Sequence, residues 1–326
     1  RVGLIRAFAS ALVHSGWDID SIRSLADIVT VEAARTGLKF ILERMDGKRT
    51  AHPHQHAKLL CTLARQWVCD MDPADLRELE AIRKKLRPPQ IGMTPKNRET
   101  LRHFDDAIVV NKFLLLPEVV HRRYRAQAAS KQSAAVKVQV ALAVALLTNA
   151  PVRCRNLHCI RLGKNLIDVG VGKSRRVHLY FAADDVKNGV ELEFTLSPDT
   201  LKLLDFYVRH VRPKLLRAPS DYLFPGQCAG PKGPALLSEQ IADTVEEFLG
   251  VRLTAHQFRH LIGYIYLQEN PGGHEVVRQL LGHRDIQTTL QFYAGMETQK
   301  AIAHYDAFLN RRKAGSLSPP NRATRK

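Results

Sequence analysis

No apolar run in this sequence is long enough to cross a lipid bilayer. A membrane-spanning helix needs about 18 or more consecutive apolar residues, whereas the best candidate, VALAVALLTNAP ending at Pro151, is shorter. We predict that this run forms a buried helix instead. The sequence also contains no segment of the secretory signal-peptide type and no internal repeat.

Cysteine is scarce and follows no pattern. The five cysteines stand at positions 61, 69, 154, 159 and 228, and no two of them form a C-x-x-C pair. An odd and scattered set excludes a regular disulfide framework and is typical of a reducing compartment.

Acidic residues are few relative to basic ones. The chain of 326 residues has 49 Lys and Arg against 32 Asp and Glu, which gives a formal net charge of +17 at pH 7. Such an excess favours a polyanionic partner, because each neutralised phosphate releases condensed counterions. An anionic membrane surface would also suit this charge, so composition alone leaves both partners open.

The spacing of apolar residues divides the chain, whose length is sufficient for two domains. Residues 2–87 show the three- and four-residue spacing of helices, and RPPQIGMTPKN at 87–97 is typical of a linker. We predict a helical domain over 1–90, a linker over 91–97, a second domain over 98–313 and a disordered basic tail over 314–326.

The second domain changes its period after a helical stretch over 97–150. NLIDVGVG, RRVHLYFAA and VELEFTL are short strand-like runs. The last two are joined across DDVKNGV, in which Asn188-Gly189 is a strong hairpin signal. Helices resume after Ser197, since Pro198 suits the first helical position. The predicted fold is therefore mainly α with one small antiparallel β-sheet, an α+β class.

The motif HQFRH at 256–260 suits either a metal or a phosphate. Two histidines one helical turn apart can share a zinc ion, as in H-E-x-x-H. A zinc protease, however, needs Glu where this chain has Gln257, and Arg259 would place a fixed cation beside the metal. The cluster HPHQH at 52–56 could also bind a metal, but it follows a Gly-Lys-Arg turn that starts at Gly47, and we predict that it lies in a solvated loop. No metal site is predicted.

The residues before HQFRH favour the phosphate interpretation. TAHQ at 254–257 is a capping box, in which Thr254 caps the helix and Gln257 reaches back to its amide. His256 and Arg259 then lie in the first two turns of a helix, where free N–H groups and the helix dipole attract anions. The alternative is an exposed helix start with a solvated arginine and two incidental histidines.

Further motifs stand on either side of HQFRH. Arg153 follows a hydrophobic helix in TNAPVRCRNL, and Lys187 directly precedes the Asn-Gly turn. LLGHRDIQTTLQFYAG contains a Gly-His pair ending at His283 and then Tyr293. In this order and spacing, Arg, Lys, His-x-x-Arg, Gly-His and Tyr resemble the tyrosine recombinase (lambda-integrase-like) family over about residues 97–312.

The resemblance implies a site-specific DNA recombinase or integrase that uses no metal and no cofactor. Tyr293 would be the nucleophile, leaving a 3′-phosphotyrosine and a free 5′-hydroxyl, and Lys187 would protonate the leaving oxygen. The other implied catalytic residues hold the phosphate; they are Arg153, His256, Arg259 and His283. His260 and Asn156 would support them.

The resemblance also implies double-stranded DNA as the partner and a tetramer on paired sites. Residues 1–90 resemble the family's core-binding domain, which clamps the duplex together with the catalytic domain. Residues 297–312 would dock onto a neighbouring copy, and DNA-bending or directionality factors would assist. The expected location is the bacterial cytoplasm, at the nucleoid. The candidate DNA-binding residues lie in RKKLR (Arg83, Lys84, Lys85, Arg87) and HRRYR (His121, Arg122, Arg123, Tyr124, Arg125); alone, either run suits a solvated face.

The first arginine motif departs from the family pattern. Pro151 stands where the family usually has Gly, and Asn156 stands where an acidic residue is common. Asn can still hydrogen-bond to an arginine and orient it. Arg155 is a rival for the role of Arg153, but its offset from Leu157 favours Arg153.

The spacing before the tyrosine is also unusual, because Tyr293 follows His283 by ten residues instead of nine. One extra residue turns a helical side chain by about 100° and puts Phe292 in the usual position. We expect a bulge or loop before Tyr293 to compensate for this extra residue. Tyr305, on a predicted amphipathic helix, is a poorer candidate for the nucleophile.

Two other functions stay open, namely a DNA-binding relative that has lost cleavage and a type IB topoisomerase.

Overall fold

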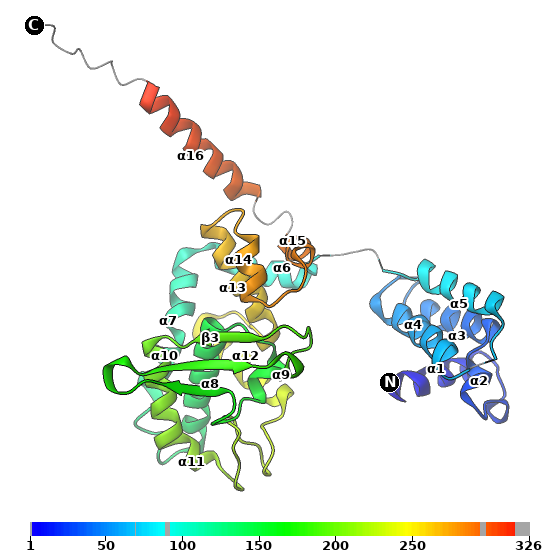
Figure 1. Cartoon of the computed structure of the whole chain (residues 1–326), viewed down its shortest axis with the longest axis horizontal. Coiled ribbons are helices and arrows are strands. Elements are labelled where there is room, and N and C mark those ends of the chain that lie inside the picture. The colour runs from blue at the N-terminus through cyan, green and yellow to red at the C-terminus, as the bar shows by residue number, and fades with distance from the viewer. Residues whose placement is uncertain (1, 69, 89–91, 294–297, 317–326) are drawn as a thin grey trace, which may run out of the picture. The chain divides into compact units, whose positions relative to one another are not determined.

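The computed structural model divides the chain into two compact units, residues 1–91 and 92–326 (Figure 1). It describes residues 2–68, 70–88, 92–293 and 298–316. The second unit starts inside the segment predicted as a linker, because Met93 is already buried in its core and helix α6 begins at Pro95.

The first unit is built of helices, as the apolar spacing of residues 2–87 predicts. They are α1 (Val2–His14), α2 (Leu25–Ile28), α3 (Val31–Glu43), α4 (Ala51–Gln66) and α5 (Pro73–Lys85), with a 3₁₀ turn at Ile19–Ser21. Thr30 and Asp72 accept backbone N–H bonds at the starts of α3 and α5, as helix caps do. The apolar faces meet around Phe8, Leu12 and Leu60, which are fully or almost fully buried.

The histidine cluster HPHQH is part of helix α4, so the prediction of a solvated loop is wrong. Thr50 caps this helix, and Pro53 stands in its first turn, where a backbone N–H has no helical partner to lose. Pro53 and His56 are buried, and His56 is packed between Phe8 and His52. The turn signal at Gly47 lies just before the helix and does not extend into it.

The second unit is organised around helix α8 (Gln132–Asn149), which contains the apolar run of the sequence. Every residue from 138 to 147 is buried, and α8 packs against helices on several sides. A helix that is apolar all round belongs inside a core. The surrounding helices are α6 (Pro95–Arg102), α7 (Ala107–Tyr124), α9 (Cys154–His158), α10 (Pro198–Phe206), α11 (Arg212–Leu215), α12 (Pro234–Leu249), α13 (Ala255–Glu269), α14 (His274–Leu280) and α15 (Ile286–Tyr293).

A three-stranded antiparallel sheet completes the second unit and confirms the predicted fold class. The strands are β1 (Leu166–Val169), β2 (Arg176–Phe181) and β3 (Leu192–Thr195), in the order β1-β2-β3. Leu179 pairs with Leu166 on one side and with Phe194 on the other. Ten residues join β2 to β3, so the Asn188-Gly189 signal marks a turn within a longer loop. Gly189 has φ +60° and donates its N–H to the carbonyl of Val186 at 2.8 Å.

The last described helix is α16 (Thr298–Ser316). It contains the predicted docking segment from residue 298 onward, and Tyr305 on it is exposed. The predicted tail over 314–326 begins inside α16, and its residues 317–326 lie outside the described part. Among the helices that the structure describes, none is long and apolar enough to cross a membrane.

A buried lysine lies in the core of the second unit. The ammonium of Lys232 donates to the side-chain oxygens of Gln139 and Gln240, the latter at 3.0 Å, and no carboxylate of the described residues pairs with it. Gln139 in turn donates to the Tyr207 hydroxyl at 2.8 Å. Burial lowers the pKa of Lys232 to about 8, because desolvation disfavours the charged form.

This lysine predicts that the protein becomes more stable as the pH rises from 8 to 10. The unfolded lysine has a pKa of about 10.4, so in this window the unfolded state binds more protons than the folded state and stability increases with pH. Relative to Lys232→Met, the free energy of unfolding should rise by about 2–3 kcal/mol. Urea unfolding of the wild type and of Lys232→Met at several pH values between 8 and 10 measures this difference in the free energy of unfolding. Parallel profiles would show that the folded lysine keeps its ordinary pKa, as a well-solvated ammonium does.

Candidate active site

A cleft of about 740 Å³ gathers seven basic side chains from four segments of the second unit. The segments are the start of α9, the β2–β3 loop, the first turns of α13 and the connection from α14 to α15. The basic side chains are those of Arg153, Lys187, His256, Arg259, His260, His283 and Arg284, and the carboxylates of Asp184 and Asp285 also line the cleft. The cleft thus brings together every predicted catalytic residue except Tyr293.

The first turn of α13 has the predicted capping box. The side-chain oxygen of Gln257 accepts from the backbone N–H of Thr254 at 2.9 Å and from its hydroxyl at 2.8 Å. Gln257 also donates to Asn97 on α6 at 3.2 Å. Gln257 therefore fixes the start of the helix, and His256 and Arg259 point into the cleft from its first two turns.

Arg259 is buried and holds three segments together. Its guanidinium donates to the carbonyl of Pro151, before α9, and to the carbonyl of Leu281, after α14. Burial, and then the charge of Arg153, lower the pKa of Arg259 to about 10, so it stays cationic at neutral pH. Two of its five N–H groups serve these carbonyls, which leaves the others for an anion in the cleft.

Arg153 stands at the N-cap position of α9 and is half-buried, and burial lowers its pKa. Its rival Arg155 does not line this cleft and faces an adjoining one instead. Position in the fold thus favours Arg153, as the offset from Leu157 predicts.

The loop that carries Lys187 is fastened on both sides. Asn156 is buried and donates its amide to the carbonyl of Asp185 at 3.0 Å. Asn188 donates to the carbonyl of Gly282 at 3.0 Å. Asn156 therefore orients the lysine loop, rather than an arginine as the sequence suggested, because α9 places its side chain against the end of that loop. Asn188 was singled out as a turn residue, and its bond to Gly282 could not be read from sequence.

The histidines of the cleft are held in their neutral form. The His256 and His260 rings lie edge to face with centroids 5.2 Å apart, and His283 Nδ1 is 2.9 Å from the Thr289 hydroxyl. Burial, and then neighbouring positive charge, lower the pKa of His260 and of His283 to about 4. The pKa of His256 is lowered by the same causes. A neutral imidazole offers one donor and one acceptor, so each can receive a proton.

Tyr293 lies outside the cleft, at the buried end of α15. It is 1% exposed, and its hydroxyl is within 3.3 Å of the carbonyls of Arg259 and His260. Burial raises its pKa well above 10. The expected bulge is absent from the described α15, which is helical through Tyr293. The extra residue therefore turns Phe292 into the cleft, where its ring lies 5.0 Å from that of His260.

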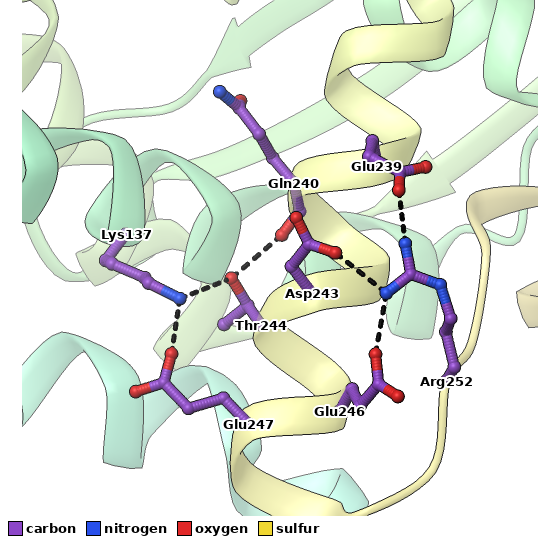
Figure 2. A network of polar contacts seen from close by, with 8 residues as sticks. All are labelled: Lys137, Glu239, Gln240, Asp243, Thr244, Glu246, Glu247 and Arg252. Atoms are coloured by element: carbon purple, nitrogen blue, oxygen red, sulfur yellow. Dashed lines mark hydrogen bonds and ion pairs between the residues drawn. The ribbon is translucent and has the colours of Figure 1, made fainter.

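The loop before α13 is tied to α12 by an ionic network. Figure 2 shows Arg252 bonded to the carboxylates of Glu239, Asp243 and Glu246, at 2.8 Å for Asp243 and 2.6 Å for Glu246. Nearby, Ser238 accepts from the backbone N–H of Ala255 at 3.3 Å. Both contacts position the start of α13, which carries His256 and Arg259.

Replacing Arg252 with Ala is expected to lower the melting temperature by about 2–4 °C, because three carboxylates would then repel one another. A network on one arginine contributes more than an isolated exposed pair. Differential scanning calorimetry at low salt measures the loss, which should shrink in about 1 M NaCl. Lys202→Ala, which breaks one exposed pair with Asp199, is the matched control and should change nothing measurable. An equal fall in melting temperature in both variants would show that the Arg252 network stabilises the fold no more than a single exposed ion pair does.

The predicted DNA-binding runs lie elsewhere. Arg83, Lys84 and Lys85 form the last turn of α5, and Arg87 follows it. In the other run, the Tyr124 hydroxyl donates to Glu247 at 3.1 Å, and Arg123 lies over the rings of Tyr124 and Phe248. The remaining residues of HRRYR line a separate pocket between α7, α8 and α10; they are His121, Arg122 and Arg125.

Within the described residues, no group of three or more His, Cys, Asp or Glu side chains is placed to hold a metal ion. The hydrogen-bond donors that line the cleft suit an anion. Three arginines, a lysine and neutral imidazoles around one space can bind a phosphate, stabilise added negative charge on it and exchange protons with it.

Comparisons with known proteins find one family and several solved structures. The sequence profile of the phage integrase family matches residues 121–300, which is 180 of the 326 residues. No curated protein sequence matches the chain.

Among solved structures, the chain is similar to the XerH site-specific recombinase bound to palindromic difH substrate, with 12% identity, a TM-score of 0.47, and 91% of this chain and 89% of that chain covered. It is similar to a lambda integrase dimer bound to a COC' core site, with 13% identity, a TM-score of 0.47, and 89% and 87% covered. It is also similar to the Tn1549 transposon integrase in complex with transposon right end DNA, with 14% identity, a TM-score of 0.46, and 93% and 98% covered.

Proposed function

This chain belongs to the phage integrase family of tyrosine recombinases, and we propose that it cuts and rejoins double-stranded DNA through a 3′-phosphotyrosine intermediate. The observation that carries the proposal is the cleft of about 740 Å³, which three arginines, a lysine and three histidines line together. The phosphotyrosine keeps the energy of the broken phosphodiester, so rejoining needs no ATP, and the basic side chains supply the charge that a metal would otherwise bring.

The arginines would bind the non-bridging oxygens of the scissile phosphate. Arg153 and Arg259 enter the cleft from different helices, and each offers forked donors that match phosphate oxygens. Arg259 is held by two carbonyls, so its guanidinium is preorganised. Loss of one preorganised donor typically costs about 10²–10³ in rate.

Lysine and histidine would move the protons. The tyrosine oxygen attacks phosphorus, the P–O5′ bond breaks, and Lys187 gives its proton to the leaving 5′-oxygen. Ionising a tyrosine of ordinary pKa at pH 7 costs about 4 kcal/mol. A neutral imidazole in the cleft lowers this cost by taking the phenol proton as the new bond forms; His256 and His283 are the candidates, and His260 supports His256 through their ring contact.

The reaction also requires Tyr293 to leave its buried position. Its hydroxyl faces carbonyls of α13, and Phe292 occupies the cleft side of α15. We infer that the structure has the chain in a resting state, and that DNA binding moves α15 so that the phenol of Tyr293 reaches the phosphate.

The partners follow from the same proposal. Double-stranded DNA would be clamped by the first unit and the catalytic unit, with Arg83, Lys84, Lys85 and Arg87 along the backbone. A tetramer would form on paired sites in the bacterial cytoplasm, with DNA-bending or directionality factors assisting. Helix α16 is suited to dock on another copy, because Ile302, Tyr305 and Phe308 on it are exposed.

A second candidate function is site-specific DNA binding without cleavage. It is favoured by the burial of Tyr293 and by the presence of Phe292 in the cleft. The double variant Phe292→Tyr with Tyr293→Phe separates the two functions, because it puts a hydroxyl on the cleft side of α15. If Tyr293 is the nucleophile of a working enzyme, this variant forms no covalent DNA. A gain of covalent DNA over wild type would instead mean that the natural chain has lost cleavage.

The proposed function is tested by recovering the protein under denaturing conditions from cells that carry the source genome. DNA that remains covalently attached is then sequenced. Enrichment of one locus through a tyrosine–phosphate bond would support the recombinase and identify its site. Tight binding to one locus with no covalent DNA, even when a nicked suicide substrate traps the intermediate, would favour the second candidate.

A further inference from the structure

The first unit has a cavity of its own, of about 400 Å³, between α1, the end of α3 and the start of α4. Four of its lining side chains are basic or imidazole groups, and none is a carboxylate. They are His14, Arg44, His52 and His56, with Ser10 and Phe40 beside them. No group of described residues here is suited to a metal, and the positive charge of Arg44 would oppose one.

His56 is the central observation. It is fully buried on α4 and lines the cavity. Neither of its ring nitrogens has a hydrogen-bond partner among the described residues. Its ring lies 6.1 Å from that of Phe8 and 4.7 Å from that of His52. Buried polar side chains are nearly always hydrogen-bonded, so the free capacity of this imidazole points to a ligand.

The surroundings of His56 give the charge of that ligand. His52 is the second residue of the 16-residue helix α4, so the cavity lies at the positive end of the helix dipole. The Arg44 guanidinium lies 5.9 Å from the Phe40 ring centroid, and no carboxylate of the described residues pairs with it. The His14 ring stacks on the same Phe40 ring, with the ring centroids 5.9 Å apart.

We propose that this cavity binds a phosphoryl group. Its lining donors come from three elements, namely α1, the end of α3 and the first turns of α4, and a tetrahedral oxyanion accepts hydrogen bonds from several sides. The group belongs either to the DNA backbone or to a free phosphorylated molecule, which share this chemistry. The binding site does not depend on the recombinase reaction; if the DNA backbone supplies the phosphate, the site adds a specific contact to the proposed clamp.

The test follows the imidazole NMR signals of the full-length protein during titration with inorganic phosphate. The His52 and His56 signals, assigned by substitution, should shift together and reach saturation. Arg44→Ala, which alters an exposed side chain and should leave the fold intact, is expected to weaken phosphate binding at least tenfold, and so is His56→Phe. His54→Ala, on the same helix but away from the cavity, is the control and should bind as wild type does.

Duplex DNA then identifies the source of the phosphate. If it is the DNA backbone, Arg44→Ala also weakens binding of duplex DNA and reduces the salt dependence by about one phosphate contact. If it is a free molecule, Arg44→Ala loses phosphate binding with unchanged duplex affinity. His52 and His56 signals that do not respond to phosphate, or an Arg44→Ala variant that binds it like wild type, would overturn the site. Neither result would touch the recombinase proposal, whose readout is covalent DNA.

Discussion

Replacement of Tyr293 by Phe is expected to abolish covalent attachment of DNA while leaving the fold almost unchanged. Without the hydroxyl no phosphotyrosine can form. The cleavage rate should therefore fall by more than the factor of about 10²–10³ that is typical for loss of one hydrogen-bond donor to the phosphate. The folded state should lose less than about 1 kcal/mol, because the hydroxyl makes two long bonds of 3.3 Å and the ring stays in place. Cleavage of a labelled site, resolved on a denaturing gel, and urea unfolding measure the two effects.

Tyr305→Phe is the matched control for this experiment. Tyr305 is exposed on α16 and is the other tyrosine considered from the sequence. It should keep full covalent attachment. Adducts that persist in Tyr293→Phe and disappear in Tyr305→Phe would transfer the nucleophile to α16, and the buried position of Tyr293 would then be part of the core alone.

The sequence predicted the frame of the cleft because local signals determine it. The apolar run became the central helix α8, the capping box placed His256 and Arg259 at the start of α13, and the strand pattern put Lys187 on the β2–β3 loop. Each of these signals acts over a few residues, through helix capping, alternation of side chains or burial of apolar surface.

The parts that could not be predicted depend on contacts between distant segments. The spacing put Phe292 in the usual position of the tyrosine, but whether a bulge would bring Tyr293 back to the cleft depends on how α15 packs on α13, which no local pattern encodes. The partner of Asn156 is a carbonyl 29 positions later in the chain. HPHQH became helix because Thr50 caps it and His56 packs against Phe8 on α1, while the Gly-Lys-Arg turn before it suggested a loop.

Replacement of Gly263 by Ala is expected to drive Tyr293 out of its buried position. A Cβ atom at residue 263 would lie 2.2 Å from the Tyr293 hydroxyl and 2.6 Å from Cζ, and the phenol is the group that can move. Overpacking of this kind costs about 1–3 kcal/mol, which shifts a two-state equilibrium about 5- to 150-fold. Tyr293 should therefore become solvent-exposed, and its pKa should fall toward the ordinary value near 10.

The change can be followed by NMR of tyrosines labelled at Cζ during a pH titration. In the wild type the Tyr293 signal should stay that of the neutral phenol beyond pH 10, because burial raises its pKa. In Gly263→Ala it should titrate with the exposed tyrosines. Gly3→Ala is the control, since it adds the same methyl to a helix with nothing within 4 Å; both variants share the gain in helix propensity of about 1 kcal/mol.

Gly263→Ala also tests the resting state. If release of Tyr293 limits the reaction, the variant should form covalent DNA faster than the wild type, even though its folded state is less stable. A variant with an exposed, normally titrating Tyr293 and no change in rate would mean that another step limits cleavage. If Tyr293 instead stays buried, α13 and α15 must have moved apart to make room for the methyl group. The contacts that hold the tyrosine ring in the core would then be stronger than those that hold α15 against α13.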